Sequence, residues 1–359
     1  MRHLPLLVLT CAALSLAACG DSDSGSDGKT PAATTAAPQD LDAIKTYLLD
    51  HTTRLQADVG KLRENAEAYH ELAASADFDS KRLLAENREE VAKLMTEAKA
   101  TFKQSNPAYE EMEGVVAGVP ELADYDVIID AGGDASDPET AVPFSIKTED
   151  GRTFKQPGNL FFLIESSLYG TEPKFGTKGD LDGDGKVEFG EALPDARFYV
   201  AAAKEFDSQA AELDAAAKKW SPNEQDALTA LVVMTPTMSE YFEAWKNSRF
   251  VAGDKATEKA FVSSSRLQDI ADILGGLKLI YANVETRIAE ANPQQAKQTG
   301  ESLTKLEAFA ARLRDQEAQG KKFTAEDADT LGSEAQNRAE AIAGQITQAA
   351  KQLNIELAS

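Results

Sequence analysis

Apolar residues recur every three or four positions along the first long segment after the N-terminal forty residues. The stripe comprises Leu41, Ile44, Leu48, His51, Leu55, Val59, Leu62, Ala66 and Tyr69. This spacing places them on one face of an α-helix, which has to be buried against other helices. The same periodicity predicts a second helix at 79–103, broken by Asn106-Pro107, and further helices from Ala196 to Leu353. The sequence therefore predicts an all-α protein.

The stretch from 106 to 192 has a different character, because Gly, Pro and Asp are dense in it. The strand-like runs 144–148 and 152–155 flank an Asp-Gly turn and predict a small β-hairpin. A short apolar helix is expected at 160–168. We therefore expect one helical domain, 40–356, in which an irregular middle region joins two helical bundles, about 40–105 and 193–356.

N-cap, proline and glycine residues predict where the C-terminal helices begin, bend and end. Ser221-Pro222 predicts an N-cap followed by Pro at the first helical position. Pro236 should kink or divide that helix, and Gly275-Gly276 marks a bend or a close helix contact. The expected later helices are 257–291, 294–319 and, with Thr324 as N-cap, 325–353.

The N-terminus has the pattern of a processing signal. Residues 1–18 combine one Arg, a short apolar run and small residues, as a secretory signal does. Leu16-Ala-Ala-Cys19 resembles the lipobox of bacterial lipoproteins, which implies acylation of Cys19 and a membrane anchor. The alternative is an ordinary cleaved signal with a chance Cys. Residues 19–39 lack large apolar side chains and are expected to form a disordered tether.

Composition excludes several classes of function. The formal net charge of −23 argues against binding nucleic acid, whose phosphates the chain would repel. Cys11 and Cys19 are the two cysteines, so the mature domain has no thiol for disulfides or thiolate metal sites. The sequence contains no His-Glu-x-x-His, no Gly-x-Ser-x-Gly and no phosphate loop. We therefore expect a protein that is not an enzyme.

Residues 180–191 match the twelve-residue EF-hand loop. The predicted Ca²⁺ ligands are Asp180, Asp182, Asp184, the Lys186 carbonyl, Glu188 through water and bidentate Glu191. Gly185 occupies the sixth position, where the sharp turn needs a residue without Cβ. The alternative is an acidic surface turn. Since no second loop of this pattern occurs, we expect structural rather than sensory calcium.

Several motifs resemble the imelysin-like periplasmic proteins, with a closer likeness to their EfeO/EfeM-type iron-uptake branch. They are Tyr109-Glu-Glu-Met-Glu113-Gly, Tyr125-Asp-Val-Ile-Ile-Asp130, Trp245-Lys-Asn-Ser-Arg249-Phe and Ser265-Arg-Leu-Gln-Asp269. The resemblance implies an all-helical double bundle and a binding role. The family signature is Gly-x-His-x-x-Glu. Aligning its Glu with Glu165 puts Phe162 in the His place, so one presumed metal ligand is absent.

The remaining carboxylates suggest a second metal site. Glu110 and Glu113, one helical turn apart, could join Glu165 around a hard cation such as Fe³⁺, and Asp126 and Asp130 form a further pair. The alternative is that Glu110 and Glu113 are solvated helix charges and that Glu165 pairs with an Arg, for example Arg266. His51 falls on the apolar stripe and is expected to be a core histidine.

These observations predict a lipid-anchored, calcium-binding, imelysin-like protein of the cell envelope, periplasmic or at the cell surface. We expect it to be a non-catalytic binding component of iron acquisition, with the membrane and an iron-uptake permease or another envelope protein as partners. The alternative is a surface interaction module stabilised by structural calcium, with no role in iron.

Overall fold

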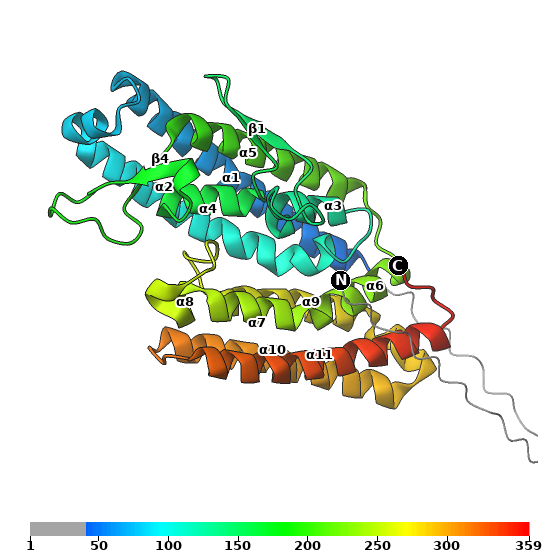
Figure 1. Cartoon of the computed structure of the whole chain (residues 1–359). Helices are drawn as coiled ribbons and strands as arrows, with labels where there is room; N and C mark the ends of the chain where they lie inside the picture. The colour runs from blue at the N-terminus through cyan, green and yellow to red at the C-terminus, as the bar shows by residue number, and fades with distance from the viewer. Residues whose placement is uncertain (1–40, 359) are drawn as a thin grey trace, which may run out of the picture. The chain divides into compact units, whose positions relative to one another are not determined.

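The computed structural model describes residues 41–358, and α-helices make up most of it (Figure 1). The helices are α1 Asp42–Ser75, α2 Ser80–Val116, α3 Ala123–Asp126, α4 Leu160–Tyr169, α5 Ala196–Lys219, α6 Glu224–Met234, α7 Met238–Asn247, α8 Arg249–Ala252, α9 Arg266–Ala291, α10 Pro293–Ala318 and α11 Ala325–Gln352. The fold is all-α, as the apolar periodicity predicts.

The long helices form two groups that pack along one seam (Figure 1). The first helix group consists of α1, α2, α4 and α5. The second helix group consists of α6, α7, α9, α10 and α11. Helix α2 of the first group packs along α9 of the second, so these two helices join the bundles directly. Every residue of the predicted stripe on α1 except Leu41 is buried, and Leu41 packs against the core.

Two short antiparallel strand pairs interrupt the helices. Strands β1 Ser145–Lys147 and β2 Thr153–Lys155 form the predicted hairpin, with Ile146 opposite Phe154. Strands β3 Gly176–Lys178 and β4 Ala192–Pro194 form the second antiparallel pair, and the acidic loop 180–191 connects them. That loop is therefore flanked by strands and not by helices.

The predicted break at Asn106-Pro107 is wrong. Helix α2 runs through Pro107 to Val116, and its one departure from helical geometry is at Asn87. A Pro inside a helix costs about 3 kcal/mol, because it removes one hydrogen bond and crowds the preceding turn. Burial of the apolar side chains that follow Pro107 offsets this cost, since apolar area removed from water stabilises the continued helix. They are Ala108, Tyr109, Met112, Val115 and Val116.

Two other predicted helix starts are corrected. Helix α6 begins two residues later than expected, because the Asn223 side chain accepts the Asp226 N–H and acts as the N-cap. The long helix expected from residue 257 begins only at Arg266, where Ser265 is the N-cap. Residues 256–265 instead form an irregular segment without helix or strand, which we call the strap. Pro236 divides α6 from α7, as predicted.

Gly276 provides the close helix contact that Gly275-Gly276 predicts. A Cβ added at Gly276 would lie 2.3 Å from the Glu111 carbonyl oxygen of α2, whereas one at Gly275 would meet nothing within 4 Å. Glycine at 276 therefore lets the backbones of α2 and α9 approach each other at the joint between the two groups.

Within residues 41–358, no helix combines the length and the apolar composition that crossing a membrane requires.

Candidate metal centre

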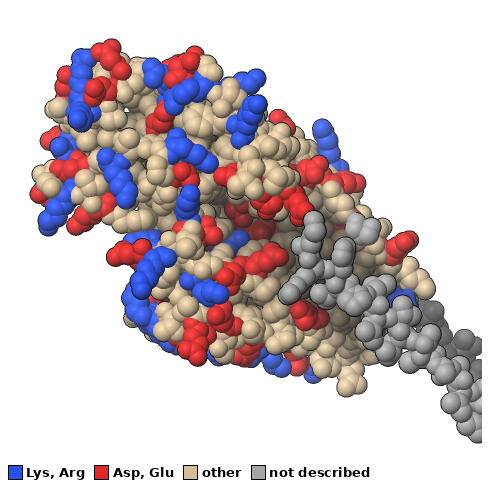
Figure 2. Space-filling view, viewed as in Figure 1, with Lys and Arg blue, Asp and Glu red and all other residues tan. Residues whose placement is uncertain are grey.

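A cavity of roughly 530 Å³ lies between the two helix groups. Its walls come from the end of α2, the segment 126–134, the turn before α4, helix α7, the strap and Arg266. Figure 2 shows acidic side chains inside the hollow that separates the two groups. Elements distant in the sequence therefore meet around one acidic space.

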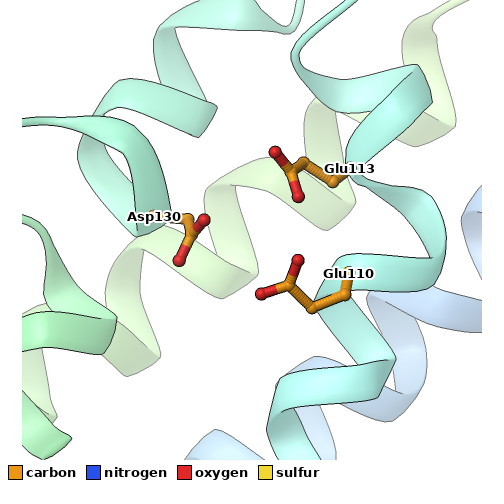
Figure 3. Close-up of side chains that lie close together, drawn as sticks. All are labelled: Glu110, Glu113 and Asp130. Atoms are coloured by element: carbon orange, nitrogen blue, oxygen red, sulfur yellow. The ribbon is translucent and has the colours of Figure 1, made fainter. Parts of the chain in front are cut away.

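Three carboxylates converge beside this cavity, and two of them, Glu113 and Asp130, line it. Oxygens of Glu110, Glu113 and Asp130 lie within 4.8 Å of one another, and the side chains point toward a common centre (Figure 3). Their residues are 0%, 3% and 7% exposed. Glu110 and Glu113 are one turn apart on α2. Asp130 comes from a π-helical turn, Val127–Ala131, a rare geometry that is frequent at functional sites.

Arg266, the first residue of α9, provides a buried positive charge beside the carboxylates. Its Nη1 lies 3.2 Å from Glu110 Oε1 and 3.1 Å from Asp269 Oδ2, and its Nη2 lies 3.9 Å from Asp130 Oδ2. The buried carboxyl groups at and around the site are Glu110, Glu113, Asp126, Asp130 and Asp269. One guanidinium cannot balance five carboxylates, so the site favours an added cation or protons.

The pKa values reflect this crowding. Burial, followed by the charge of Asp269, raises the pKa of Glu110 well above its usual range. Burial raises the pKa of Asp130 to about 7, although Arg266 opposes the shift. Burial alone would lower the pKa of Arg266, but the carboxylates of Glu110 and Asp269 raise it well above its usual value. The arginine is therefore charged, and burial disfavours the charged forms of Glu110 and Asp130.

Two buried polar atoms of the site have no hydrogen-bond partner within residues 41–358. They are Glu113 Oε2 and Arg266 Nε. A buried carboxylate oxygen is usually satisfied, because leaving it unpaired costs about 1–3 kcal/mol. The unpaired Glu113 oxygen belongs to the three-carboxylate group, so it has the position and the chemistry of a metal ligand.

Two tyrosines contact the acidic cluster. Tyr241 of α7 donates to Glu113 Oε1 at 2.8 Å, and Tyr109 of α2 donates to Asp126 Oδ1 at 2.6 Å. The guanidinium of Arg266 lies 4.5 Å from the centre of the Tyr241 ring. The guanidinium also lies 4.1 Å from the centre of the ring of Phe261, a residue of the strap. Aromatic faces favour a cation at this range, which holds the arginine in place.

Glu165 does not join the group that was predicted for it. Its Oε1 accepts hydrogen bonds from the backbone N–H groups of Val262 and Ser263, at 3.0 and 2.8 Å. Burial raises the pKa of Glu165 to about 7. The carboxyl group therefore holds the strap against α4, and Asp130 completes the group with Glu110 and Glu113. The prediction grouped Asp130 only with Asp126, by their i, i+4 spacing.

The alternative of solvated helix charges is wrong for Glu110 and Glu113, since both are buried. Arg266 pairs with Glu110 and not with Glu165. Phe162, in the place of the signature His, lines the cavity. His51 is a buried, paired histidine, as expected: its Nε2 lies 2.6 Å from Glu111 Oε2 and its Nδ1 lies 2.7 Å from the Tyr47 carbonyl oxygen.

The acidic loop 180–191 brings three of its predicted ligands together. Oxygens of Asp180, Asp182 and Asp184 lie within 4.8 Å of one another, and Gly185 has φ +86°. Asp180 Oδ1 accepts the Gly183 N–H at 2.7 Å. The loop is thus folded around its own carboxylates.

Glu191, the last of the predicted ligands, closes the loop. Glu191 accepts backbone N–H groups of Leu181 and Glu188, at 2.9 and 2.6 Å, and Glu188 is exposed. Lys186 follows Gly185, and its N–H donates to Asp184 Oδ1 at 2.7 Å. Arg88 of α2 lies 3.3 Å from Asp180 Oδ2 and offsets part of the negative charge.

Cys19, the signal 1–18 and the tether 19–39 lie outside the described residues.

Residues 43–348 match the sequence profile of the imelysin family, peptidase M75. The match covers most of the chain, so this protein belongs to the imelysin family. No curated protein matches the chain. Among solved structures, it is similar to a candidate iron-regulated protein A precursor from Parabacteroides distasonis, with 12% identity and a TM-score of 0.48. That alignment covers 88% of this chain and 97% of the other.

Proposed function

We propose that this imelysin-family protein binds a hard metal cation, with Fe³⁺ as the candidate cargo, through Glu110, Glu113 and Asp130. The observation that carries the proposal is the convergence of three buried carboxylates beside a cavity, where one oxygen of Glu113 has no partner among residues 41–358. Carboxylate oxygens are hard ligands, and hard cations prefer them. The excess of buried negative charge supplies the driving force for uptake.

We propose that the role is binding and not catalysis, in an iron-uptake branch of the family. A cavity of roughly 530 Å³ can admit a small chelate of the ion as well as the bare ion. The lipobox-like Cys19 supports a lipid-anchored location in the cell envelope. An envelope permease is the expected recipient of the cargo.

Calorimetry of the full-length protein with Fe³⁺ supplied as its nitrilotriacetate chelate tests the metal site. Glu113→Gln should weaken binding at least tenfold, because the change removes a charged ligand from a buried site. Glu97→Gln is the matched control, since Glu97 is an exposed carboxylate on the same helix. Equal affinities for the wild type and Glu113→Gln would contradict the proposed site and favour the alternative of a surface interaction module.

The acidic loop supports a second, structural metal site for Ca²⁺. Its twelve-residue pattern, the left-handed Gly185 and the three converging aspartates match what Ca²⁺ requires. The loop lies between β3 and β4 and contacts α2 through Arg88. Bound calcium would fix this connection without taking part in cargo binding.

A further inference from the structure

A groove of roughly 480 Å³ follows the seam between α10 and α11. These two helices pack side by side and form one edge of the second helix group (Figure 1). The volume of the groove lies within the range of about 300–1,000 Å³ that is usual for small-molecule sites. All of its lining residues come from α10 and α11, so the groove is separate from the carboxylate cluster.

The groove is lined by three cationic side chains, and no carboxylate of residues 41–358 lines it. The cations are Lys305 and Arg312 of α10 and Arg338 of α11. Because the whole chain has a formal net charge of −23, this surface is opposite in sign to the rest of the protein. The overall charge repels anions, so an anion that binds this protein needs a local set of cations such as this one.

The floor of the groove is apolar and holds the two arginines in place. The ring of Phe309 forms this floor and is only 3% exposed. The guanidinium of Arg312 lies 5.3 Å from the centre of the ring, and that of Arg338 lies 4.8 Å from it. Cation–π attraction operates at these distances. Since Ala308 and Ala341 also line the groove, a ligand with a carbon skeleton can contact apolar surface beside both guanidiniums.

The cations have hydrogen-bonding capacity left for a ligand. Arg312 is exposed and forms no ion pair within residues 41–358. Arg338 pairs with Glu334 of its own helix, and Lys305 Nζ lies 3.8 Å from Glu301 Oε2. Exposed pairs of this kind are weak, and a guanidinium has five N–H donors. A ligand can therefore bind both arginines without breaking a buried interaction.

We propose that the groove between α10 and α11 binds a small organic polyanion, with several carboxylate or phosphate groups on a short carbon skeleton. Arg312 and Arg338 each bind one anionic group through the paired hydrogen bonds that a guanidinium forms with carboxylate or phosphate. Lys305 neutralises a further negative charge, and Phe309 contacts the skeleton. This site goes beyond the proposed metal binding and does not depend on it.

Isothermal titration calorimetry of the full-length protein tests the groove with two probes, tricarballylate and fructose 1,6-bisphosphate. The first carries carboxylates and the second carries phosphates, so the tighter probe identifies the anionic group. The buffer contains no added metal ion, because polyanions bind metals themselves. At least one probe should bind tenfold more tightly than acetate, which has one charged group, and than inorganic phosphate, which has no carbon skeleton.

Arg312→Gln and Arg338→Gln should each weaken binding of that probe at least fivefold, because each change removes a charged fork from the groove. Arg314→Gln is the matched control: Arg314 lies on the same helix, pairs with Asp315 and does not line the groove. This variant should bind as the wild type does. Binding should also weaken in 1 M NaCl, where the screening length falls to about 3 Å.

A measurement on the wild type alone avoids any dependence on how well a variant folds. The bound probe should protect Lys305 from acetylation by an N-hydroxysuccinimide ester, as measured by mass spectrometry. Lys297, on the same helix but outside the groove, should stay reactive.

Three results would overturn the proposal. They are an absence of binding by both probes, equal weakening in Arg312→Gln and Arg314→Gln, and inorganic phosphate binding as tightly as the organic probes. The first would leave the arginines as a cover for Phe309, with their stems packed on its ring. The second would reduce the effect to net charge, and the third would exclude a role for the apolar floor.

Discussion

Arg266 provides the buried positive charge that offsets part of the negative charge of the carboxylate cluster. It contacts Glu110 and Asp269 directly and Asp130 at longer range. Removing one partner of a buried ion pair leaves an uncompensated charge, which typically costs 3–5 kcal/mol. The guanidinium of Arg266 also faces the ring of Tyr241, a side chain in the cavity wall. The same charged group therefore contacts both the carboxylates and the cavity.

Glu165 gives the protein a pH-dependent contact outside the proposed ligand group. Its folded-state pKa is raised to about 7 by burial, above the usual value of a glutamate. Between about pH 4.5 and 7 the folded protein therefore binds more protons than the unfolded chain. Stability from this group is present at low pH and is lost as the pH rises through 7.

We therefore expect Glu165→Gln to stabilise the protein at pH 8, by about 1–3 kcal/mol, and to have little effect at pH 5. The amide keeps an oxygen for the Val262 and Ser263 N–H groups but never becomes charged. Urea unfolding of both proteins at the two pH values measures the difference. Glu97→Gln, which changes an exposed carboxylate, should show no such pH dependence. A Glu165→Gln variant that is less stable at pH 8 would contradict the raised pKa.

The sequence shows where carboxylates recur at helical spacing but not how deeply they are buried. The i, i+3 spacing of Glu110 and Glu113 is the same on an exposed helix face and on a buried one. The Asp126 and Asp130 spacing is likewise visible, but the π-helical turn that directs Asp130 to Glu110 has no sequence signature. Glu165 was predicted as a ligand through an alignment to a motif, and its real partners are backbone groups that no motif encodes.

At the scale of elements, α2 and α9 carry most of the site. Helix α2 contributes Glu110 and Glu113, and α9 contributes Arg266 and Asp269. Their packing depends on Gly276, where the α2 backbone leaves no room for a side chain. The relative position of the carboxylates and the arginine is therefore set by backbone contact between two helices.

Gly276→Ala should destabilise the protein by roughly 1–3 kcal/mol, because the new methyl group collides with the Glu111 carbonyl oxygen and forces the helices apart. Gly275→Ala is the matched control on the same helix. With open space at that position, it should be neutral or stabilising by up to about 1 kcal/mol. Thermal unfolding of the two variants tests this contrast, and equal melting temperatures would refute the close contact.

Periodicity predicted most helices well because the apolar stripes are long and regular. It failed where long-range packing outweighed a local signal. Pro107 indicates a helix end, yet α2 continues because its last turns are buried. The strap 256–265 looks helical in sequence, but its backbone N–H groups at Val262 and Ser263 bond to Glu165 instead of to a preceding turn. Neither outcome can be inferred from neighbouring residues alone.

At the scale of the whole molecule, the acidic loop 180–191 and the carboxylate cluster are separate, so the ions proposed for them should have separate effects. The loop involves Asp180, Asp182 and Asp184 between β3 and β4, whereas the cavity lies between the helix groups. Calcium should stabilise the fold without filling the cavity. The formal net charge of −23 adds a general attraction for cations to both sites.

Saturating Ca²⁺ should raise the melting temperature by a few degrees over a chelator-treated sample, since a ligand at 100 times its Kd stabilises by about 2.7 kcal/mol. Asp180→Ala should remove this increase, because it deletes the first ligand of the loop. Asp254→Ala, at an exposed position outside the loop, should retain it. Differential scanning calorimetry gives the comparison, and an unchanged calcium response in Asp180→Ala would reject the calcium site.

The pairing of Glu110 with Arg266 joins positions 156 residues apart in the chain. Such a contact closes a very long loop, so it forms only after both helix groups exist and have met. Until then the acidic residues of α2 have no guanidinium beside them. The cluster should consequently assemble late in folding, so an ion bound at the proposed site would report that the two helix groups have docked.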